Sequence, residues 1–224
     1  MTGTDIMANS YTVIAAGVAS GTGTGSNVSV LLDETSDGNT VSVGTTPITG
    51  GTFTAASNGM GVLTIDSGGS AEAFSVTMIG TNTGFIMEGT QASPGSSLLA
   101  GLMEAQTTPS GGFGNSSASG LFVEANAFPA DPASHVEGGS ITLTPGSPTG
   151  SLSGASDESQ ELSCQSCLAV NSSISTTYSV DANGRITLFD ATGGGGSIFG
   201  WLRDTSHGVL LDSSSKSLTI QLEH

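Results

Sequence analysis

Hydrophobic and small polar residues alternate along short stretches of this chain, which is the pattern of β-strands with one buried face. Phe74, Val76 and Met78 would share one face of such a strand. Ser75 and Thr77 would share the other face. Asn-Gly and Asp-Gly pairs follow several of these stretches and supply the residues that tolerate positive φ in tight hairpin turns. The pattern therefore predicts an all-β chain of short antiparallel strands.

The chain contains two similar halves. Thr52–Gly59 matches Thr177–Gly184, about 125 residues later, and in both places an apolar run, an aspartate and a glycine-rich turn follow. Phe74–Val76 then corresponds to Phe199–Trp201. Because several elements keep the same order in both halves, we infer that one ancestral unit was duplicated in tandem.

The front parts of the two halves match more weakly, at a spacing nearer to about 110 residues. Tyr11–Val13 resembles Phe122–Glu124, and Val28–Leu31 resembles Ser140–Leu143. The change in spacing predicts about fourteen extra residues in the second copy. We place this insertion at residues 157–173, which contain both cysteines.

An open sheet of local hairpins exposes its edge strands, and closing the sheet into a barrel removes those edges. We therefore expect two tandem antiparallel up-and-down barrels, or barrel-like sandwiches, of about seven to eight strands each. The expected organisation is a first copy at 1–108, a linker at 109–119, a second copy at 120–221 and residues of a vector-derived tag at 222–224. The linker is expected because its proline, glycine and serine residues offer almost nothing to bury.

One segment does not follow the strand pattern. Leu99, Leu102 and Met103 lie at helical spacing. Their counterpart in the second copy, Ser217–Ile220, alternates like a strand. Since duplicated units share a fold, we predict a strand in both places.

The charge of the chain excludes several partners. It has 3 cationic side chains against 19 acidic ones, which gives a formal net charge of −16. Nucleic acid is excluded because its binding depends on lysine and arginine that neutralise phosphates. An anionic membrane surface is disfavoured for the same reason, and no apolar run is long enough to span a bilayer. Only 10% of the residues are charged, so hydroxyl groups must form much of the surface.

Residues 178–185 read Tyr-Ser-Val-Asp-Ala-Asn-Gly-Arg, and an alternating strand follows them. This stretch resembles a repeat of secreted and surface proteins of soil bacteria, with the form Tyr-x-Val-Asp-x-Asn-Gly-Arg. The first copy keeps only Phe53, Asn58 and Gly59 of the motif. The resemblance implies export and repetition, and it implies no reaction. We therefore expect an extracytoplasmic protein, secreted or at the cell surface, whose signal peptide has been removed.

Two loops carry candidate ligands. Cys164 and Cys167 form a Cys-x-x-Cys motif, which in an exported protein favours a local disulfide, with unpaired thiols and redox or metal chemistry as alternatives. Asp33, Asp37 and Asn39 carry oxygen atoms that a calcium ion could bind if they converged. A solvated hairpin turn explains the same residues without an ion. We prefer the turn and predict no cofactor.

Trp201 and Arg203 are the remaining candidates for a site. Because they align with Val76 and Met78, the duplication predicts that both project into the second barrel or line its rim. An aromatic ring and a cation in that place could hold an anionic or aromatic ligand. Alternatively, Trp201 fills the core while Arg203 reaches solvent or pairs with Asp204.

The sequence shows no catalytic motif. His135 and His207 lie in predicted turns, where His207 aligns with Asn82, and no Gly-x-Ser-x-Gly motif is present. Our first hypothesis is a non-enzymatic, exported structural or adhesive module that has a cell-surface partner. The alternatives are a lipocalin-like barrel that binds a small apolar ligand, and a hydrolase whose catalytic triad assembles from distant residues.

Overall fold

The computed structural model of the chain is built from antiparallel β-strands, which confirms the predicted all-β fold. It describes residues 2–4, 12–21, 27–36, 39–42, 47–66, 71–89, 99–126, 135–160, 168–189, 198–212 and 218–224. The chain divides into two units: unit 1 comprises residues 1–36 and 40–105, and unit 2 comprises residues 37–39 and 106–224. None of the helices in the described ranges has the length and apolar character needed to cross a membrane.

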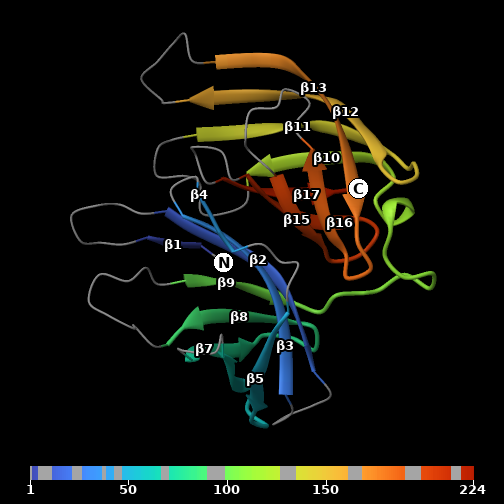
Figure 1. Ribbon diagram of the computed structural model, residues 1–224. Helices are drawn as coiled ribbons and strands as arrows, with labels where there is room; N and C mark the ends of the chain where they lie inside the picture. The colour runs from blue at the N-terminus through green and yellow to red at the C-terminus, as the bar shows by residue number, and fades with distance from the viewer. Residues whose placement is uncertain are drawn as a thin grey trace. The chain divides into compact units, whose positions relative to one another are not determined.

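Unit 2 is a closed barrel of eight strands, each paired with its neighbours in sequence order (Figure 1). Its strands are β10 (Gly120–Asn126), β11 (His135–Thr144), β12 (Gly150–Gln160), β13 (Leu168–Val180), β14 (Arg185–Phe189), β15 (Ile198–Leu202), β16 (His207–Asp212) and β17 (Leu218–Glu223). The last strand pairs with the first, with Val123 opposite Glu223 and Glu124 opposite Leu222. The barrel is therefore closed by the chain's own β10.

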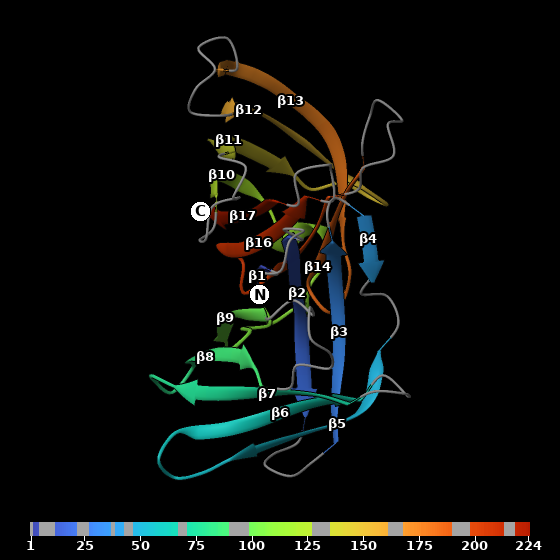
Figure 2. The same cartoon turned by 90° about the vertical axis from the view of Figure 1, so that its left-hand side faces the viewer.

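Unit 1 is a curled sheet with the strand order β2-β1-β9-β8-β7-β6-β5-β3-β4, in which β2 also pairs with β3 (Figure 2). Its strands are β1 (Thr2–Thr4), β2 (Thr12–Gly21), β3 (Asn27–Ser36), β4 (Asn39–Ser42), β5 (Ile48–Ala55), β6 (Met60–Asp66), β7 (Ala71–Met78), β8 (Thr83–Glu88) and β9 (Leu99–Glu104). Among the described residues β1 joins β2 to β9, through pairs such as Thr2 with Ile14 and Gly3 with Leu99.

The two matching sequence segments form equivalent hairpins, β5–β6 and β13–β14. Each turn is closed by a backbone hydrogen bond, in unit 2 from the Asp181 N–H to the Arg185 carbonyl (2.9 Å). Gly59 and Gly184 occupy the same turn position, with φ of 83° and 85°, a region that favours glycine. The Asn-Gly pairs therefore form the tight turns that the sequence predicted.

Backbone hydrogen bonds also fix how the next strands correspond. The Met78 N–H donates to the Gly59 carbonyl in unit 1, and the Leu202 N–H donates to the Gly184 carbonyl in unit 2, each at 2.8 Å. Met78 is therefore equivalent to Leu202, and β7 is equivalent to β15. Continuing through the strand pairs, β8 corresponds to β16 and β9 to β17. The predicted strand at residues 99–104 is confirmed.

In the front halves, the correspondence inferred from the sequence is wrong by one strand. The order of pairing gives β1 the place of β10, so that β2 corresponds to β11 and β3 to β12. Val28-Ser29 then aligns with Leu152-Ser153, and Asp33-Glu34 with Asp157-Glu158, at nearly the same spacing of about 125 residues as in the rear halves. The predicted insertion at 157–173 is therefore wrong. Because the short apolar strands have similar sequences, the sequence alignment matched β2 with β10 and β3 with β11. Each of these unit 2 strands is the neighbour of the true equivalent.

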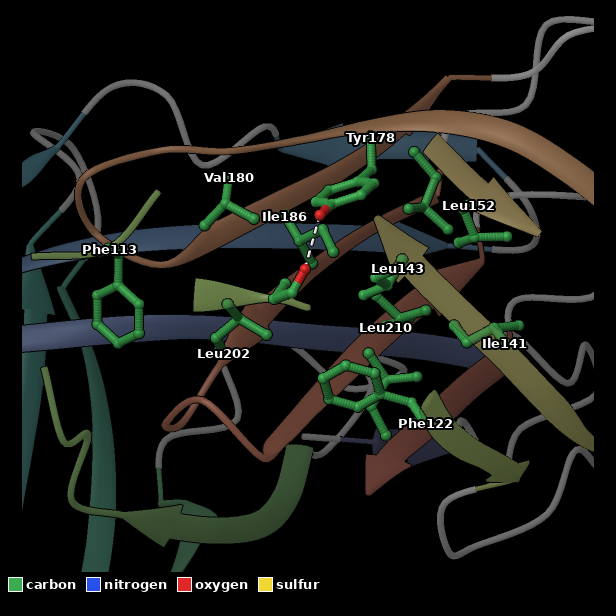
Figure 3. Packing of buried hydrophobic residues seen from close by; sticks show 13 residues of the cluster. Phe113, Phe122, Ile141, Leu143, Leu152, Tyr178, Val180, Ile186, Leu202 and Leu210 are labelled. Carbon is green, nitrogen blue, oxygen red and sulfur yellow. Dashed lines mark hydrogen bonds between the residues drawn. The ribbon is translucent and has the colours of Figure 1, made fainter. Parts of the chain in front are cut away.

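The interior of unit 2 is filled by side chains from all parts of the barrel (Figure 3). The largest inner side chains that are at most 2% exposed are those of Phe122, Ile141, Leu143, Leu152, Tyr178, Ile186, Leu202, Leu210 and Leu222. Burying one such side chain contributes about 1.5–3 kcal/mol. Leu222 belongs to this core although we expected it to be part of a tag, so residues 222–223 are structural members of β17.

Residues 106–119, which include the predicted linker at 109–119, pack against one end of the unit 2 barrel instead. We call them the capping segment; they include the 3₁₀-helix η1 (Asn115–Ser117). Phe113 and Ala118 are buried in the core cluster of unit 2. The side-chain amide of Gln106 donates to the carbonyl oxygens of Leu202 (2.7 Å) and Asn183 (3.0 Å). The sequence argument underestimated how much one phenylalanine and one alanine can bury.

Tyr178 and Asn115 hold the capping segment to the barrel. The Tyr178 hydroxyl donates to the carbonyl oxygens of Ala118 (2.6 Å) and Asn115 (3.0 Å). The Asn115 side chain accepts the Val180 N–H (2.8 Å) and donates to two carbonyl oxygens of the β11–β12 turn, at 2.8 and 2.9 Å. Burial raises the pKa of Tyr178, so its hydroxyl stays protonated and able to donate.

The core of unit 1 is smaller. Its buried members are Val28, Val30, Leu63, Ile65, Phe74, Val76 and Ile86. Phe53, Met78 and Met103 pack against this cluster and are only partly buried. In unit 2 the equivalents of these three residues are Tyr178, Leu202 and Leu222, which are fully buried. One end of unit 1 is therefore less enclosed than the same end of unit 2.

Candidate functional site

Trp201 and Arg203 lie on the outer face of the unit 2 barrel. The register places Arg185 opposite Trp201 and Ile186 opposite Gly200. Ile186 belongs to the inner cluster, and successive residues of a strand point to opposite faces. The prediction that Trp201 points into the barrel is therefore wrong, while Arg203 follows the end of β15 in the β15–β16 turn.

The reason for this error is a shift of one residue. The sequence alignment equated Trp201 with Val76, whereas the strand pairs equate it with Thr77, since Thr77 lies opposite Met60 as Trp201 lies opposite Arg185. A shift of one residue moves every side chain of a strand to the other face. By the same register His207 corresponds to Thr83 and not to Asn82.

Trp201 is one member of a buried outer face on β14, β15 and β16. The Arg185 guanidinium carbon lies 4.5 Å from the centre of the Phe199 ring, and its Nη1 donates to the Thr187 hydroxyl (2.8 Å). Trp201 is 4% exposed and Leu211 is fully buried. These side chains are buried although they do not belong to the inner cluster. Sequence reasoning missed Arg185, which it treated only as the end of a hairpin motif.

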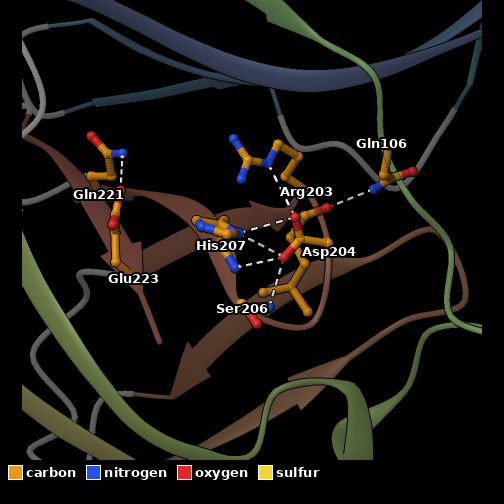
Figure 4. A network of polar contacts seen from close by, with 8 residues as sticks. Gln106, Arg203, Asp204, Ser206, His207, Gln221 and Glu223 are labelled. Atoms are coloured by element: carbon orange, nitrogen blue, oxygen red, sulfur yellow. Dashed lines mark hydrogen bonds and ion pairs between the residues drawn. The ribbon is translucent and has the colours of Figure 1, made fainter. Parts of the chain in front are cut away.

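Asp204 organises the β15–β16 turn (Figure 4). Its carboxylate lies 2.9 and 3.0 Å from Nδ1 of His207 and accepts the backbone N–H groups of Ser206 (2.7 Å) and His207 (2.9 Å). Arg203 Nε donates to the other carboxylate oxygen at 3.2 Å. The alternative in which Arg203 pairs with Asp204 is therefore the observed one. Figure 4 shows the three partners grouped around this carboxylate.

The pKa of Asp204 reflects these contacts. Burial alone raises this pKa, but hydrogen bonds from the His207 ring, the Ser206 N–H and Arg203 outweigh burial and lower the pKa to about 2. An aspartate that orients Nδ1 of a histidine also occurs in catalytic triads. Here the same carboxylate closes the turn through two backbone N–H groups, so its geometry is explained by local structure.

The calcium candidates do not form a described site. Asp33 is fully buried in β3, and its equivalent is Asp157. Asp37 and the side chain of Asn39 lie outside the described residues. Asp157 Oδ1 accepts the N–H of Asn171 at 2.6 Å, which shows a structural use for that carboxylate. Across the described ranges, histidine, cysteine and acidic side chains form no group of three or more that could hold a metal ion.

Two further predictions fall where the structure gives no description. Cys164 and Cys167 lie outside the described residues, so the predicted disulfide stays a prediction. His135 begins β11, and its side chain is not described.

The outer face of unit 1 carries an exposed apolar band that the sequence reasoning missed. Along one row of strand pairs Met60 lies opposite Thr77, Thr77 opposite Phe85, and Phe85 opposite Leu102. In the next row, Val62 and Met87 flank Ser75. The five large apolar side chains of the band are 42–60% exposed: Met60, Val62, Phe85, Met87 and Leu102. The signal was present in the sequence, because apolar residues occupy both alternating sets of positions in residues 60–65 and 85–87.

The band and the buried face of unit 2 are equivalent surfaces. Met60 corresponds to Arg185, Thr77 to Trp201 and Met87 to Leu211 by the register. These three positions are exposed in unit 1 and buried in unit 2, whereas Phe85 corresponds to half-buried Val209 and Leu102 to exposed Gln221. Comparison with known proteins adds no further assignment, since no family model, no curated protein and no solved structure matches the chain.

Proposed function

We propose that this chain is a non-enzymatic, exported structural or adhesive module that acts through contacts with other macromolecules. The observation that carries the proposal is the apolar band on unit 1. Soluble proteins seldom expose contiguous apolar side chains, and such patches mark interaction sites. Serine, threonine and alanine fill the positions between the five large side chains, so the centre of the band carries no charge.

The packing of unit 2 supports a scaffold role over a carrier role. A lipocalin-like carrier needs a cavity inside its barrel. The inner positions of unit 2 are occupied by large buried side chains such as Phe122, Tyr178 and Leu210, and Phe113 packs at one end. A barrel filled in this way is suited to holding a fixed shape.

The polar side chains with the best-defined geometry also support a structural role. Asp204, His207 and Arg203 stabilise one turn, and Asn115 with Tyr178 fixes the capping segment. In each group the hydrogen bonds join side chains to backbone groups or to other side chains of the same unit. We therefore assign these residues to stability, and we assign recognition to the apolar band.

An adhesion assay tests this proposal. Beads that carry the purified chain are measured for adhesion to protein-coated glass, and the same is done for Phe85→Asp and Leu102→Asp, which place a charge in the band. We expect the wild type to adhere and both variants to lose most of this adhesion. Thr52→Asp adds the same charge at an exposed position of β5 outside the band and should adhere like the wild type.

Two results would contradict the proposal. Equal adhesion of the wild type and the band variants would remove the role of the apolar band. A serine-reactive phosphonate that labels one residue of the folded chain, and is blocked by an ester substrate, would show an enzyme instead of a structural module.

A further inference from the structure

Serine and threonine side chains form a regular array on the outer face of unit 2, over the neighbouring strands β11, β12 and β13 (Figure 1). The pairs of these strands run without a register shift from Gly150 to Ser156 of β12. Residues that alternate with the array, such as Ile141 and Leu152, are buried inside the barrel. We call the array the hydroxyl face, and all its members are exposed: Ser140, Thr142, Thr144, Ser151, Ser153, Ser173, Ser175 and Thr177.

The hydroxyl groups lie in rows that cross the strands. One row contains Thr144, Ser151 and Thr177, which lie opposite one another in register. The row ends at Phe189 of β14, which lies opposite Thr177 and is 44% exposed. Neighbouring strands are about 4.8 Å apart, and alternate residues of one strand are about 6.6 Å apart. The row therefore presents an exposed aromatic ring followed by hydroxyl groups at the regular spacing of the strands.

The hydroxyl face carries no charge, although the chain has 19 acidic side chains and a net charge of −16. Ala155 occupies the one outward position within the rows that lacks a hydroxyl group. The next outward residue of β12, Asp157, lies beyond the last row. An anionic polymer would be repelled by the acidic chain, and a cationic one finds no carboxylate within the array. The charge distribution therefore favours an uncharged, polar partner.

The fold itself does not require this array. In unit 1 the equivalents of Ser140 and Ala155 are Val18 and Leu31, which lie opposite each other. The pairing of β3 with β5 also shifts its register at one point, whereas the equivalent part of the β12–β13 pairing is regular. Among the described strands, regular rows of hydroxyl groups are thus a feature of unit 2.

We propose that the hydroxyl face binds a neutral polysaccharide, with one sugar ring stacked on Phe189. A serine or threonine hydroxyl both donates and accepts hydrogen bonds, as sugar hydroxyl groups do, so the two surfaces are complementary. The C–H groups on one side of a sugar ring pack on the negative face of an aromatic ring.

The geometry of the row fits an extended glycan. The spacing between strands is close to the length of one hexose unit, so successive sugars lie over Phe189, Thr177 and Ser151. Each hydrogen bond contributes little alone, and affinity comes from repeated contacts along one glycan chain. Unit 2 thereby gains a recognition surface of its own, separate from the apolar band of unit 1.

Binding to insoluble polysaccharides tests the proposal. The purified chain is mixed with suspensions of cellulose, chitin or starch granules, which are neutral, and the protein left in solution is measured after centrifugation. We expect saturable retention by at least one of them, and competition by a soluble oligosaccharide of the same sugar. Polygalacturonate beads, which are anionic, should not retain the chain. Retention on these beads alone would contradict a neutral ligand.

A matched pair of variants locates the binding. Thr177→Val removes a hydroxyl group from the row and keeps the shape of the side chain, and Thr52→Val makes the same change at the equivalent position of unit 1. We expect Thr177→Val to bind about threefold or more weakly and Thr52→Val to bind like the wild type. Phe189→Thr introduces the residue of unit 1 at this position, Thr64, and should also weaken binding about threefold or more. Tryptophan fluorescence in urea checks that each variant is folded.

Two outcomes would overturn the proposal. The first is that none of the three neutral polysaccharides retains the chain; if Thr177→Val then weakens adhesion to protein-coated glass, the occupant of the face is a protein. The second is equal retention of the wild type, Thr177→Val and Phe189→Thr, because binding would then lie elsewhere. Phe85→Asp changes the apolar band and should bind polysaccharide like the wild type, so this proposal and the proposed function can fail separately.

Discussion

The two units have the same order of equivalent strands but differ in how far their inner side chains are buried. Unit 2 has a full-length β10 between β11 and β17, a capping segment over one end and a core of large buried side chains. In unit 1 the equivalents of three fully buried side chains of unit 2, Phe53, Met78 and Met103, are only partly buried. The comparison separates the strands and hairpins that both units share from the capping segment and large buried side chains that enclose the interior of unit 2.

The difference also shows how a duplicated unit can change its role. The hairpins, turns and inner apolar positions are common to both units, so they serve the fold itself. The capping segment belongs to unit 2 alone among the described residues. Unit 1 instead presents an exposed apolar band, a feature that marks interaction sites in other proteins.

The largest expected effect comes from truncating the same inner position in each unit. Leu222→Ala removes a fully buried side chain from the sealed end of unit 2 and should lower its free energy of unfolding by about 2–5 kcal/mol. Met103→Ala removes the equivalent, partly exposed side chain of unit 1 and should cost about 1–2 kcal/mol. Urea unfolding followed by the single tryptophan, Trp201, reports on unit 2, and hydrogen exchange of β7 and β8 reports on unit 1. Equal losses in the two variants would show that both ends are equally enclosed.

A second test removes the side chain that fixes the capping segment. Asn115→Ala loses one accepted and two donated hydrogen bonds, which should destabilise unit 2 by about 2–3 kcal/mol, since each bond contributes about 0.5–1.5 kcal/mol. Asn115→Asp keeps the acceptor for the Val180 N–H but places a carboxylate oxygen against the two carbonyl oxygens of the β11–β12 turn, so its loss should be at least as large as that of the alanine variant. Tryptophan fluorescence in urea measures both variants. If unit 1 were destabilised as much as unit 2, the segment would not be specific to unit 2.

A smaller effect is expected from making unit 2 resemble unit 1 at a single atom. Tyr178→Phe introduces the residue that unit 1 has at this position, Phe53, and removes the hydroxyl that donates to the Ala118 and Asn115 carbonyls. The expected loss is about 1–2 kcal/mol in urea unfolding. The reverse change, Phe53→Tyr, should leave the stability of unit 1 nearly unchanged, because unit 1 has no described capping segment to accept the new donor. A clear gain in unit 1 would contradict this difference between the units.

The strands and turns were predictable from the sequence because they depend on local patterns. Alternation along β7 and the glycines at positions 59 and 184 predicted a strand and two hairpin turns, and the structure shows them. The strand at 99–104 was predicted against its helical spacing because its duplicate alternates. In these places local sequence and tertiary structure favour the same element.

The register was not predictable, because it depends on pairing between strands. Trp201 looked like an inner residue because the two alignments differ by a shift of one residue. The strand pairs and the hydrogen bond from the Leu202 N–H to the Gly184 carbonyl decide between them. The capping segment was missed for a similar reason. Its composition is that of a linker, and its burial follows from Tyr178 and Asn115, which are distant in sequence from one another. A search for Ser-x-x-x-Asp-Glu at both 29–34 and 153–158 would have aligned the front halves correctly.

The smallest expected effect is a pH dependence that has opposite signs in the two units. The pKa of Asp204 is lowered to about 2 in folded unit 2, so its contribution to stability is present above the ordinary value of 3.8 and is lost as the pH falls through about 2. In unit 1, burial and then the nearby Glu88 raise the pKa of Glu72, so stability is fully present below 4.5 and is lost as the pH rises through the raised pKa. Both side chains are partly exposed, and each effect should stay below about 1 kcal/mol. Hydrogen exchange measured for each unit between pH 2 and pH 6 should show acid weakening unit 2 while it strengthens unit 1, and Asp204→Asn and Glu72→Gln should each flatten the profile of their own unit alone. Parallel profiles in the two units would mean that other carboxylates dominate the pH response.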